Sequence, residues 1–73
     1  MEKQKYYIVL CRDYIDGKTV VVTDSGISYD LDKGKLFSVI GDAMRAVIRY
    51  NQITSYKFEI ETIFVKSEIV FSA

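Results

Sequence analysis

The residues of this sequence that can carry chemistry are one thiol and a set of carboxylates. Cys11 is the only cysteine, and the chain contains no histidine. A cysteine nucleophile needs a neighbouring base or cation to form the thiolate. Arg12 is adjacent in sequence, but successive side chains of a strand point to opposite faces, so Arg12 points away from Cys11. We therefore interpret Cys11 as a small apolar residue of the core.

Aspartates gather in the first half of the chain, where Lys18 is the only basic residue between positions 13 and 32. They are Asp13, Asp16, Asp24, Asp30 and Asp32. Carboxylates at one end of a sheet can hold Mg²⁺ or Ca²⁺, but this spacing matches no calcium-binding loop and no paired-metal motif. Turn and cap positions explain at least four of the five. We expect no metal and no cofactor, and keep a small metal-dependent enzyme as a third hypothesis.

Basic residues gather in and just before a predicted helix. They are Lys33, Lys35, Arg45 and Arg49, with Asp42 as the nearby acidic residue. Each phosphate contact needs its own cation, whereas ten basic and ten acidic residues cancel in this chain to a formal charge of zero. A solvated helix face is the default interpretation. Nucleic-acid binding through these four residues is the alternative function.

The composition is that of a small globular domain. Of its residues, 49% are hydrophobic and 27% are charged. A length of 73 residues leaves no room for a second domain, so we expect a single domain over residues 1–73. Without histidine the chain has no imidazole base, and with one cysteine it has neither a disulfide nor a cysteine and histidine zinc site. Most familiar enzyme mechanisms are thereby excluded, and we expect a protein that is not an enzyme.

The N-terminal residues carry no targeting pattern. Residues 1–5 are charged, and the longest apolar stretch, residues 6–11, is shorter than the apolar region of a signal peptide and far shorter than a membrane span. We expect a cytoplasmic protein that makes no membrane contact.

The first half of the chain has the pattern of three short strands. Residues 5–15 are rich in aromatic and β-branched types and end at Asp16 and Gly17, a pair that fits the left-handed positions of a type I′ turn. Residues 18–23 predict a second strand, and Gly26 suits the turn that follows. Residues 27–31 alternate apolar and polar types, as a third strand with one wet face does.

The apolar period then changes from two to 3.6, which predicts one amphipathic helix. Its apolar face consists of Leu36, Phe37, Ile40, Ala43, Met44, Val47 and Ile48. We expect Asp30 or Asp32 to cap its start and Asn51 to take a left-handed conformation past its end. Gly41 is unfavourable within a helix, and a close approach to the sheet or to a partner is the expected compensation. On this interpretation Ile40→Asp unfolds the protein.

The last third of the sequence has strand-forming residue types and contains no typical turn residue. From residue 53 to residue 73 there is no Gly, Pro, Asn or Asp. Tyr56, Phe58 and Ile60 alternate with charged residues, but Ile63 and Val65 then place apolar side chains on the parity that had been polar.

Three arrangements account for this change of parity. A bulge at residues 61–62 turns the strand over, or a tight turn at residues 66–68 sends residues 69–71 back as a fifth strand. Alternatively, the end of the chain pairs with another chain, because a single strand over residues 55–70 would be about 50 Å long.

The summed pattern is βββαβ with a further β as an option. This predicts an α+β domain with a mostly antiparallel sheet and one helix packed on one face. If the fourth strand lies beside the first, the helix acts as a crossover, giving the order 3-2-1-4 with the fourth strand parallel to the first. The layout resembles the partial RNase-H-like domain of HicB-type antitoxins. In this sequence Asp24-Ser25-Gly26 stands where that family has a turn containing Gly and Cys, and the resemblance implies a fold only.

The first strand carries apolar residues on both parities, as a strand buried on both faces does, although one helix covers only one face. We therefore expect a second copy or another protein to cover the remaining face or a sheet edge, the alternative being a curled sheet with a few exposed aromatics. The predicted partner-binding residues are Tyr7, Val9, Ile63, Val65, Ile69 and Phe71. The expected function is a protein-protein interaction module that forms a homodimer through strand edges. Its size fits a small inhibitor or antitoxin-like protein of bacterial or phage origin.

Overall fold

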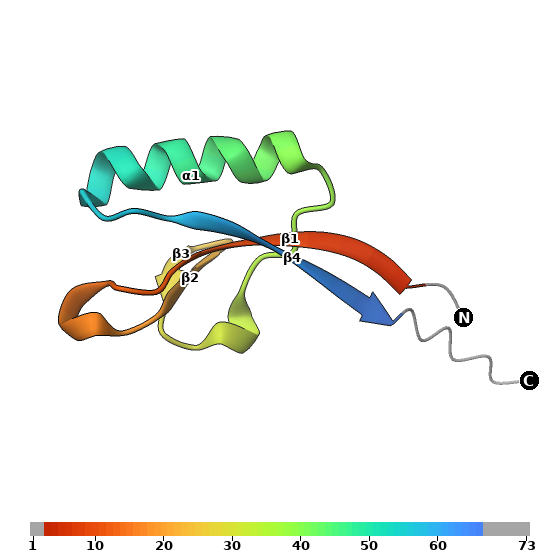
Figure 1. The fold of residues 1–73 in the computed structure, drawn as a ribbon, viewed down its shortest axis with the longest axis horizontal. Helices are drawn as coiled ribbons and strands as arrows, with labels where there is room; N and C mark the ends of the chain where they lie inside the picture. Colours follow the sequence, from red (N-terminus) through yellow and green to blue (C-terminus); the bar gives the residue numbers. More distant parts are fainter. Residues whose placement is uncertain (1–2, 67–73) are drawn as a thin grey trace, which may run out of the picture.

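The computed structural model describes residues 3–66, which form a four-stranded sheet with one helix on one face (Figure 1). The α+β fold predicted from the sequence is confirmed. The strands are β1 (Lys3–Cys11), β2 (Val20–Thr23), β3 (Gly26–Ser28) and β4 (Glu59–Lys66). The helix α1 spans Ile40–Thr54, and two short segments lie in the connections: η1 (Ile15–Gly17), which has left-handed residues, and the 3-10 helix η2 (Leu31–Lys33).

The sheet has the order β3-β2-β1-β4 that the sequence predicted, but β4 is antiparallel to β1. The predicted parallel arrangement is wrong because the connection between β3 and α1 carries the chain back along the sheet before the helix begins. Within this connection Phe37 forms an antiparallel bridge with Tyr7 of β1. The helix therefore runs in the direction of β1, and β4 returns against it (Figure 1).

The pairing of β1 with β4 is continuous. Its register runs from Lys3 opposite Lys66 to Leu10 opposite Glu59 without a break, so the bulge proposed at residues 61–62 is absent from this pair and that prediction is wrong. Ile63 consequently shares a face with Glu61. The predicted turn at residues 66–68, the fifth strand and a tail that pairs with another chain fall largely or wholly outside the described residues and stay predictions.

The first turn has the expected backbone. Asp16 and Gly17 have φ values of 63° and 71°, the left-handed conformation that a type I′ turn requires. The strand before it is shorter than predicted, because β1 ends at Cys11 and the chain then forms a loop. The Tyr14 N–H closes this loop by donating to the Lys18 carbonyl at 2.9 Å.

The helix begins later than predicted, and neither aspartate caps it. Its N-cap residue is Val39, whose side chain makes no capping hydrogen bond. Asp30 instead accepts a hydrogen bond from the Asp32 N–H at 3.1 Å and caps η2. The backbone of Phe37 is already engaged with Tyr7, and the N–H of Lys35 donates to the Val22 carbonyl, so this segment is held against the sheet as extended chain.

The helix also ends later than predicted. Ser55, with φ of 63°, takes the left-handed position that the sequence pattern predicts for Asn51. Asn51 lies inside the helix, where its Oδ1 accepts a hydrogen bond from the Phe58 N–H at 2.6 Å. This bond fixes the helix against the residue that leads into β4.

The core lies between α1 and the sheet. Its buried members are Val9, Cys11, Val20, Val22, Phe37, Ala43 and Phe58. The helix contributes Ala43 together with Ala46, Val47 and Tyr50, and the Tyr50 ring packs on Phe58 with centroids 5.5 Å apart. Cys11 is a buried free thiol in this core. The buried side of α1 is therefore rotated toward Tyr50, and the predicted core positions Ile40, Met44 and Ile48 are wrong.

Part of the second face of the sheet is covered by the chain itself. Leu10 and Val21 are buried although they point away from α1. The segment around η2 lies on that side of the sheet (Figure 1), and a Cβ atom placed on Gly34 would stand 2.8 Å from Cγ2 of Val21. An external partner is thus not needed over this half of the face.

Gly41 does not approach the sheet closely. A Cβ atom added there would meet only Cγ1 of Val39, at 3.9 Å, so the close approach to the sheet expected from the sequence is wrong, and an approach to a partner stays a prediction. Because Ala is favoured over Gly within helices, Gly41→Ala is expected to raise the free energy of unfolding by about 0.5–1 kcal/mol. Urea denaturation followed by circular dichroism measures this change. A loss of stability would contradict the open surroundings of this residue.

Candidate interaction surface

The helix exposes a line of apolar side chains. Ile40, Met44 and Ile48 are 50%, 51% and 57% exposed. Their spacing of four residues places them one above another on the same side of α1. Single exposed apolar residues are common on protein surfaces, but a contiguous line of large ones is typical of an interaction site.

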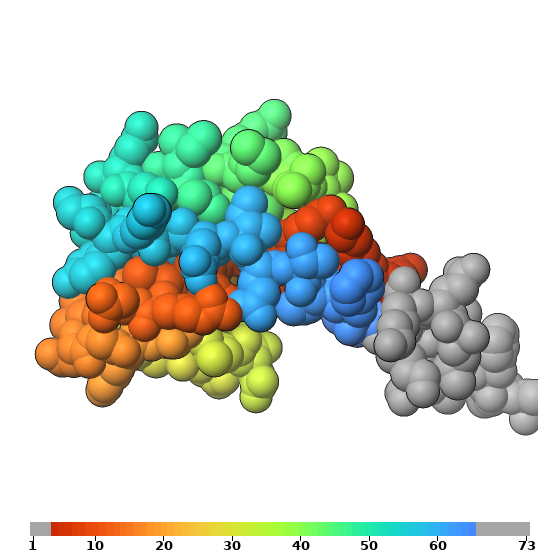
Figure 2. Space-filling model, viewed as in Figure 1, coloured from red at the N-terminus to blue at the C-terminus, as the bar shows by residue number. Residues whose placement is uncertain are grey.

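This line lies on the β4 side of the helix. The opposite flank faces β2, since Arg45, Ala46 and Arg49 line a cavity together with residues of β2. Asn51 follows Ile48 on the same side of the helix by one turn, and it bonds to the backbone that leads into β4. In Figure 2 the helix and β4 lie next to each other on one side of the molecule.

The outer edge of β4 has no strand partner within residues 3–66. The backbone N–H and C=O of Tyr7 both bond to Phe37, each at 2.8 Å, so they point away from β4. Thr62 is opposite Tyr7, and in an antiparallel pair both residues of such a position direct their backbone groups outward. The outer edge of β4 therefore presents the N–H and C=O groups of Thr62 and, by alternation, of Ile60 and Phe64.

The same three residues of β4 point their side chains toward the α1 face. Ile60 packs against the core, Thr62 is exposed, and Phe64 is 63% exposed. The side chains of these three residues and the apolar line of α1 thus lie on the same face of the sheet, next to the open edge of β4. We call the residues Ile40, Met44, Ile48, Ile60, Thr62 and Phe64 the β4-side surface.

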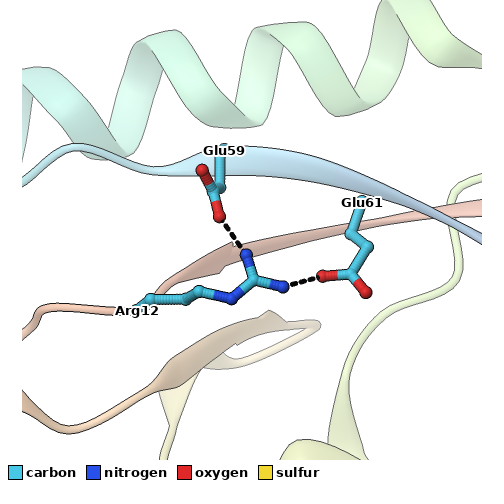
Figure 3. Close-up of polar contacts among 3 residues, drawn as sticks. All are labelled: Arg12, Glu59 and Glu61. Carbon is cyan, nitrogen blue, oxygen red and sulfur yellow. Dashed lines mark hydrogen bonds and ion pairs between the residues drawn. The ribbon is translucent and has the colours of Figure 1, made fainter.

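A cluster of charged side chains lies at the start of β4, on the face of the sheet away from α1. The guanidinium of Arg12 donates from Nη1 to Glu59 and from Nη2 to Glu61 (Figure 3). All three side chains are exposed, so these pairs contribute about 1 kcal/mol or less to stability. They join the loop after β1 to β4, a contact that the sequence pattern did not reveal because it depends on the register of the two strands.

The residues predicted to bind a partner lie in three different environments. Tyr7 is half-buried beside Phe37, and Val9 is fully buried in the core and offers no surface. Ile63 and Val65 lie on the face away from α1, where Val65 is exposed and Ile63 is half-buried. The remaining two, Ile69 and Phe71, fall outside the described residues. The apolar line of α1 was missed because the helical period assigned it to the core.

Three of the four basic residues come together. Lys35, Arg45 and Arg49 line one cavity of about 250 Å³ between α1 and β2, whereas Lys33 lines another cavity beside β3. Acidic neighbours reduce the positive charge at the first cavity. Asp24 contacts Lys35, and Asp42 contacts Arg45, each at 3.4 Å.

The aspartates take separate structural roles. Asp16 forms the first turn, Asp30 caps η2, and Asp24 pairs with Lys35. In the part of the chain that the structure describes, no three acidic or cysteine side chains are close enough together to hold a metal ion.

Comparison of the chain with protein-family models, with curated proteins and with solved structures finds no match. Among the described residues, no helix has the length and apolar character that crossing a membrane requires. The function must therefore be argued from the surface itself.

Proposed function

We propose that this domain is a non-enzymatic protein-protein interaction module that binds through the β4-side surface. The observation that carries the proposal is the line of Ile40, Met44 and Ile48, which lies on the side of α1 next to the open edge of β4. An open edge supplies main-chain hydrogen bonds to a partner strand, and apolar side chains beside it supply buried area.

The composition of the surface fits this role. None of its six side chains is charged, and depletion of charge is what distinguishes the centre of a protein interface from ordinary surface. Glu59 and Glu61 stand on the other face of β4, where Arg12 pairs with both.

The same proposal covers the biological setting. The small size and the absence of histidine fit a small inhibitor or antitoxin-like protein of bacterial or phage origin that self-associates through strand edges. A cytoplasmic location is part of the proposal, because the only cysteine is a buried free thiol and such thiols are usual in a reducing compartment.

Nucleic-acid binding is the second candidate. It is favoured by the convergence of Lys35, Arg45 and Arg49 around one cavity that Phe37 and Tyr50 also line. Phosphate binding releases counterions, so its affinity would fall steeply with salt, whereas binding through the uncharged β4-side surface would be nearly independent of salt.

Affinity capture from the lysate of the native host distinguishes the two candidates. We expect one protein at about stoichiometric yield that resists nuclease, is lost with Met44→Lys and is retained when Arg45 and Arg49 are both replaced by Glu. Bound material that is sensitive to nuclease and lost only with the two arginine replacements would contradict the proposal and establish the alternative.

A further inference from the structure

We infer that the β4-side surface is a homodimer interface in which β4 pairs antiparallel with β4 of a second copy about a two-fold axis at Thr62. The inference rests on the proposed function and names the partner as another copy of this chain. Backbone geometry permits this arrangement, helix placement sets the position of the axis, and charge disfavours the register with the axis at Glu61.

The backbone groups of β4 are placed for self-pairing. An interface between identical copies is self-complementary, and two identical edge strands related by a two-fold axis are necessarily antiparallel. With the axis at Thr62, this residue is opposite Thr62 of the second copy, and Ile60 is opposite Phe64 of the second copy. These are the three residues whose N–H and C=O groups point outward, so each opposed pair exchanges two hydrogen bonds.

The same axis brings the two helices together. An axis perpendicular to the sheet keeps both helices on one face, and α1 packs over both β1 and β4. Neighbouring strands are about 4.8 Å apart, so the middle of the β1 and β4 pair lies about 5 Å from the axis. The two helices would then lie about 10 Å apart, within the range of packed helices, with their Ile40, Met44 and Ile48 lines facing each other.

The positions along the strand also agree. The hydrogen bond between Asn51 and Phe58 places the last turns of the helix beside the start of β4. Met44 lies seven residues before Asn51, about 10 Å along the helix, and Thr62 lies four residues after Phe58, about 13 Å along the strand. The middle of the apolar line therefore stands close to the axis at Thr62.

Charge favours this register over the one with the axis at Glu61. With the axis at Thr62, Glu61 is opposite Ile63 of the second copy, and Glu59 is opposite Val65 of the second copy. With the axis at Glu61, two carboxylates would stand directly opposite each other, and like charges in such a pair are destabilising. The register with the axis at Thr62, which the position of the helix favours, thus places no two carboxylates directly opposite each other.

Sedimentation equilibrium of the full chain tests the inference. From about 1 to 200 µM we expect conversion from the 8.4 kDa chain to a species of twice that mass. Thr62→Pro removes an outward N–H that β1 does not use, so the variant is expected to keep its circular dichroism spectrum and stay monomeric throughout.

Met44→Lys provides a second test that does not alter the strand. Facing a second copy, the charge would be desolvated at the centre of the interface, and we expect dimerisation to weaken at least about tenfold. The matched control is Ile53→Lys. Ile53 is 65% exposed, lies nine residues further on and thus on the opposite side of α1, and its replacement should leave the dimer unchanged.

Two results would overturn the inference. A wild-type chain that stays monomeric over the whole range would show that no second copy occupies the edge, whether residues 67–73 or solvent covers it. A dimer that survives both Thr62→Pro and Met44→Lys would place the interface elsewhere. In either case the capture experiment still tests the proposed function. Capture of a different protein by the wild type but not by Met44→Lys would support that function without a homodimer.

Discussion

Ala43→Asp is expected to unfold the domain, whereas Ile40→Asp, one turn earlier on the helix, is expected to leave it folded. Ala43 is fully buried between α1 and the sheet, and Ile40 is half exposed. An unpaired carboxylate in a core destabilises by several kcal/mol, while a domain of this length has a total stability of only about 4–11 kcal/mol. The sequence pattern alone gave the opposite expectation for Ile40.

Circular dichroism and thermal denaturation of the two variants measure this contrast. The Ala43→Asp variant should show no cooperative transition, and the Ile40→Asp variant should retain one. A cooperatively folded Ala43→Asp variant would show that α1 does not pack on the sheet through this residue. An unfolded Ile40→Asp variant would return the helix to the orientation predicted from periodicity.

Phe58→Ala is expected to lower the free energy of unfolding by about 3–5 kcal/mol, the loss that follows removal of a buried aromatic ring. Phe58 is buried just before β4, where its ring packs against Tyr50 and Tyr14 at centroid distances of 5.5 and 6.3 Å. Its removal leaves a cavity below the end of α1. Urea denaturation provides the measurement.

Tyr29→Ala is the matched control for Phe58→Ala. The Tyr29 ring also contacts Tyr14, with centroids 6.4 Å apart, but the residue is largely exposed. We expect its replacement to change the free energy of unfolding by less than about 1 kcal/mol. Equal losses in the two variants would mean that contact with Tyr14, rather than burial, determines the stability of this end of the core.

Local patterns were enough to predict the elements and the order of the strands. Alternation, β-branched residues and the left-handed preference of Asp16 and Gly17 are short-range properties, and so is the helical period after residue 36. The direction of β4 was not predictable in this way. It depends on the connection between β3 and α1, which has no period and is held by the bridge between Phe37 and Tyr7.

The rotation of α1 was hidden for a related reason. The apolar residues of the helix cover a broad face that includes Ala43, Val47 and the line of Ile40, Met44 and Ile48. Periodicity shows that these residues share a face, but only the position of the sheet decides which half is buried. Small Ala43 and the large ring of Tyr50 face the sheet here, and the longer aliphatic residues are left at the β4 side.

The surplus of apolar residues predicted a cover for the sheet but did not locate it, and coverage by a partner stays a prediction. The sequence suggested that part of the sheet needs a cover, and it selected Tyr7, Val9 and residues near the end of the chain. The structure buries Val9 under α1 and covers Val21 with the segment around η2. The apolar surface that remains beside an open strand edge is on α1 and β4.

Residue-by-residue amide hydrogen exchange of β4 in the wild-type chain tests the central claim, that two copies pair through this edge, most directly. The N–H groups of Glu61 and Ile63 face β1, and those of Ile60, Thr62 and Phe64 face outward. We predict that the outward amides become protected as the protein concentration rises, while the inward amides are protected at every concentration. Outward amides that exchange rapidly at all concentrations, beside protected inward ones, would contradict pairing of two copies through β4.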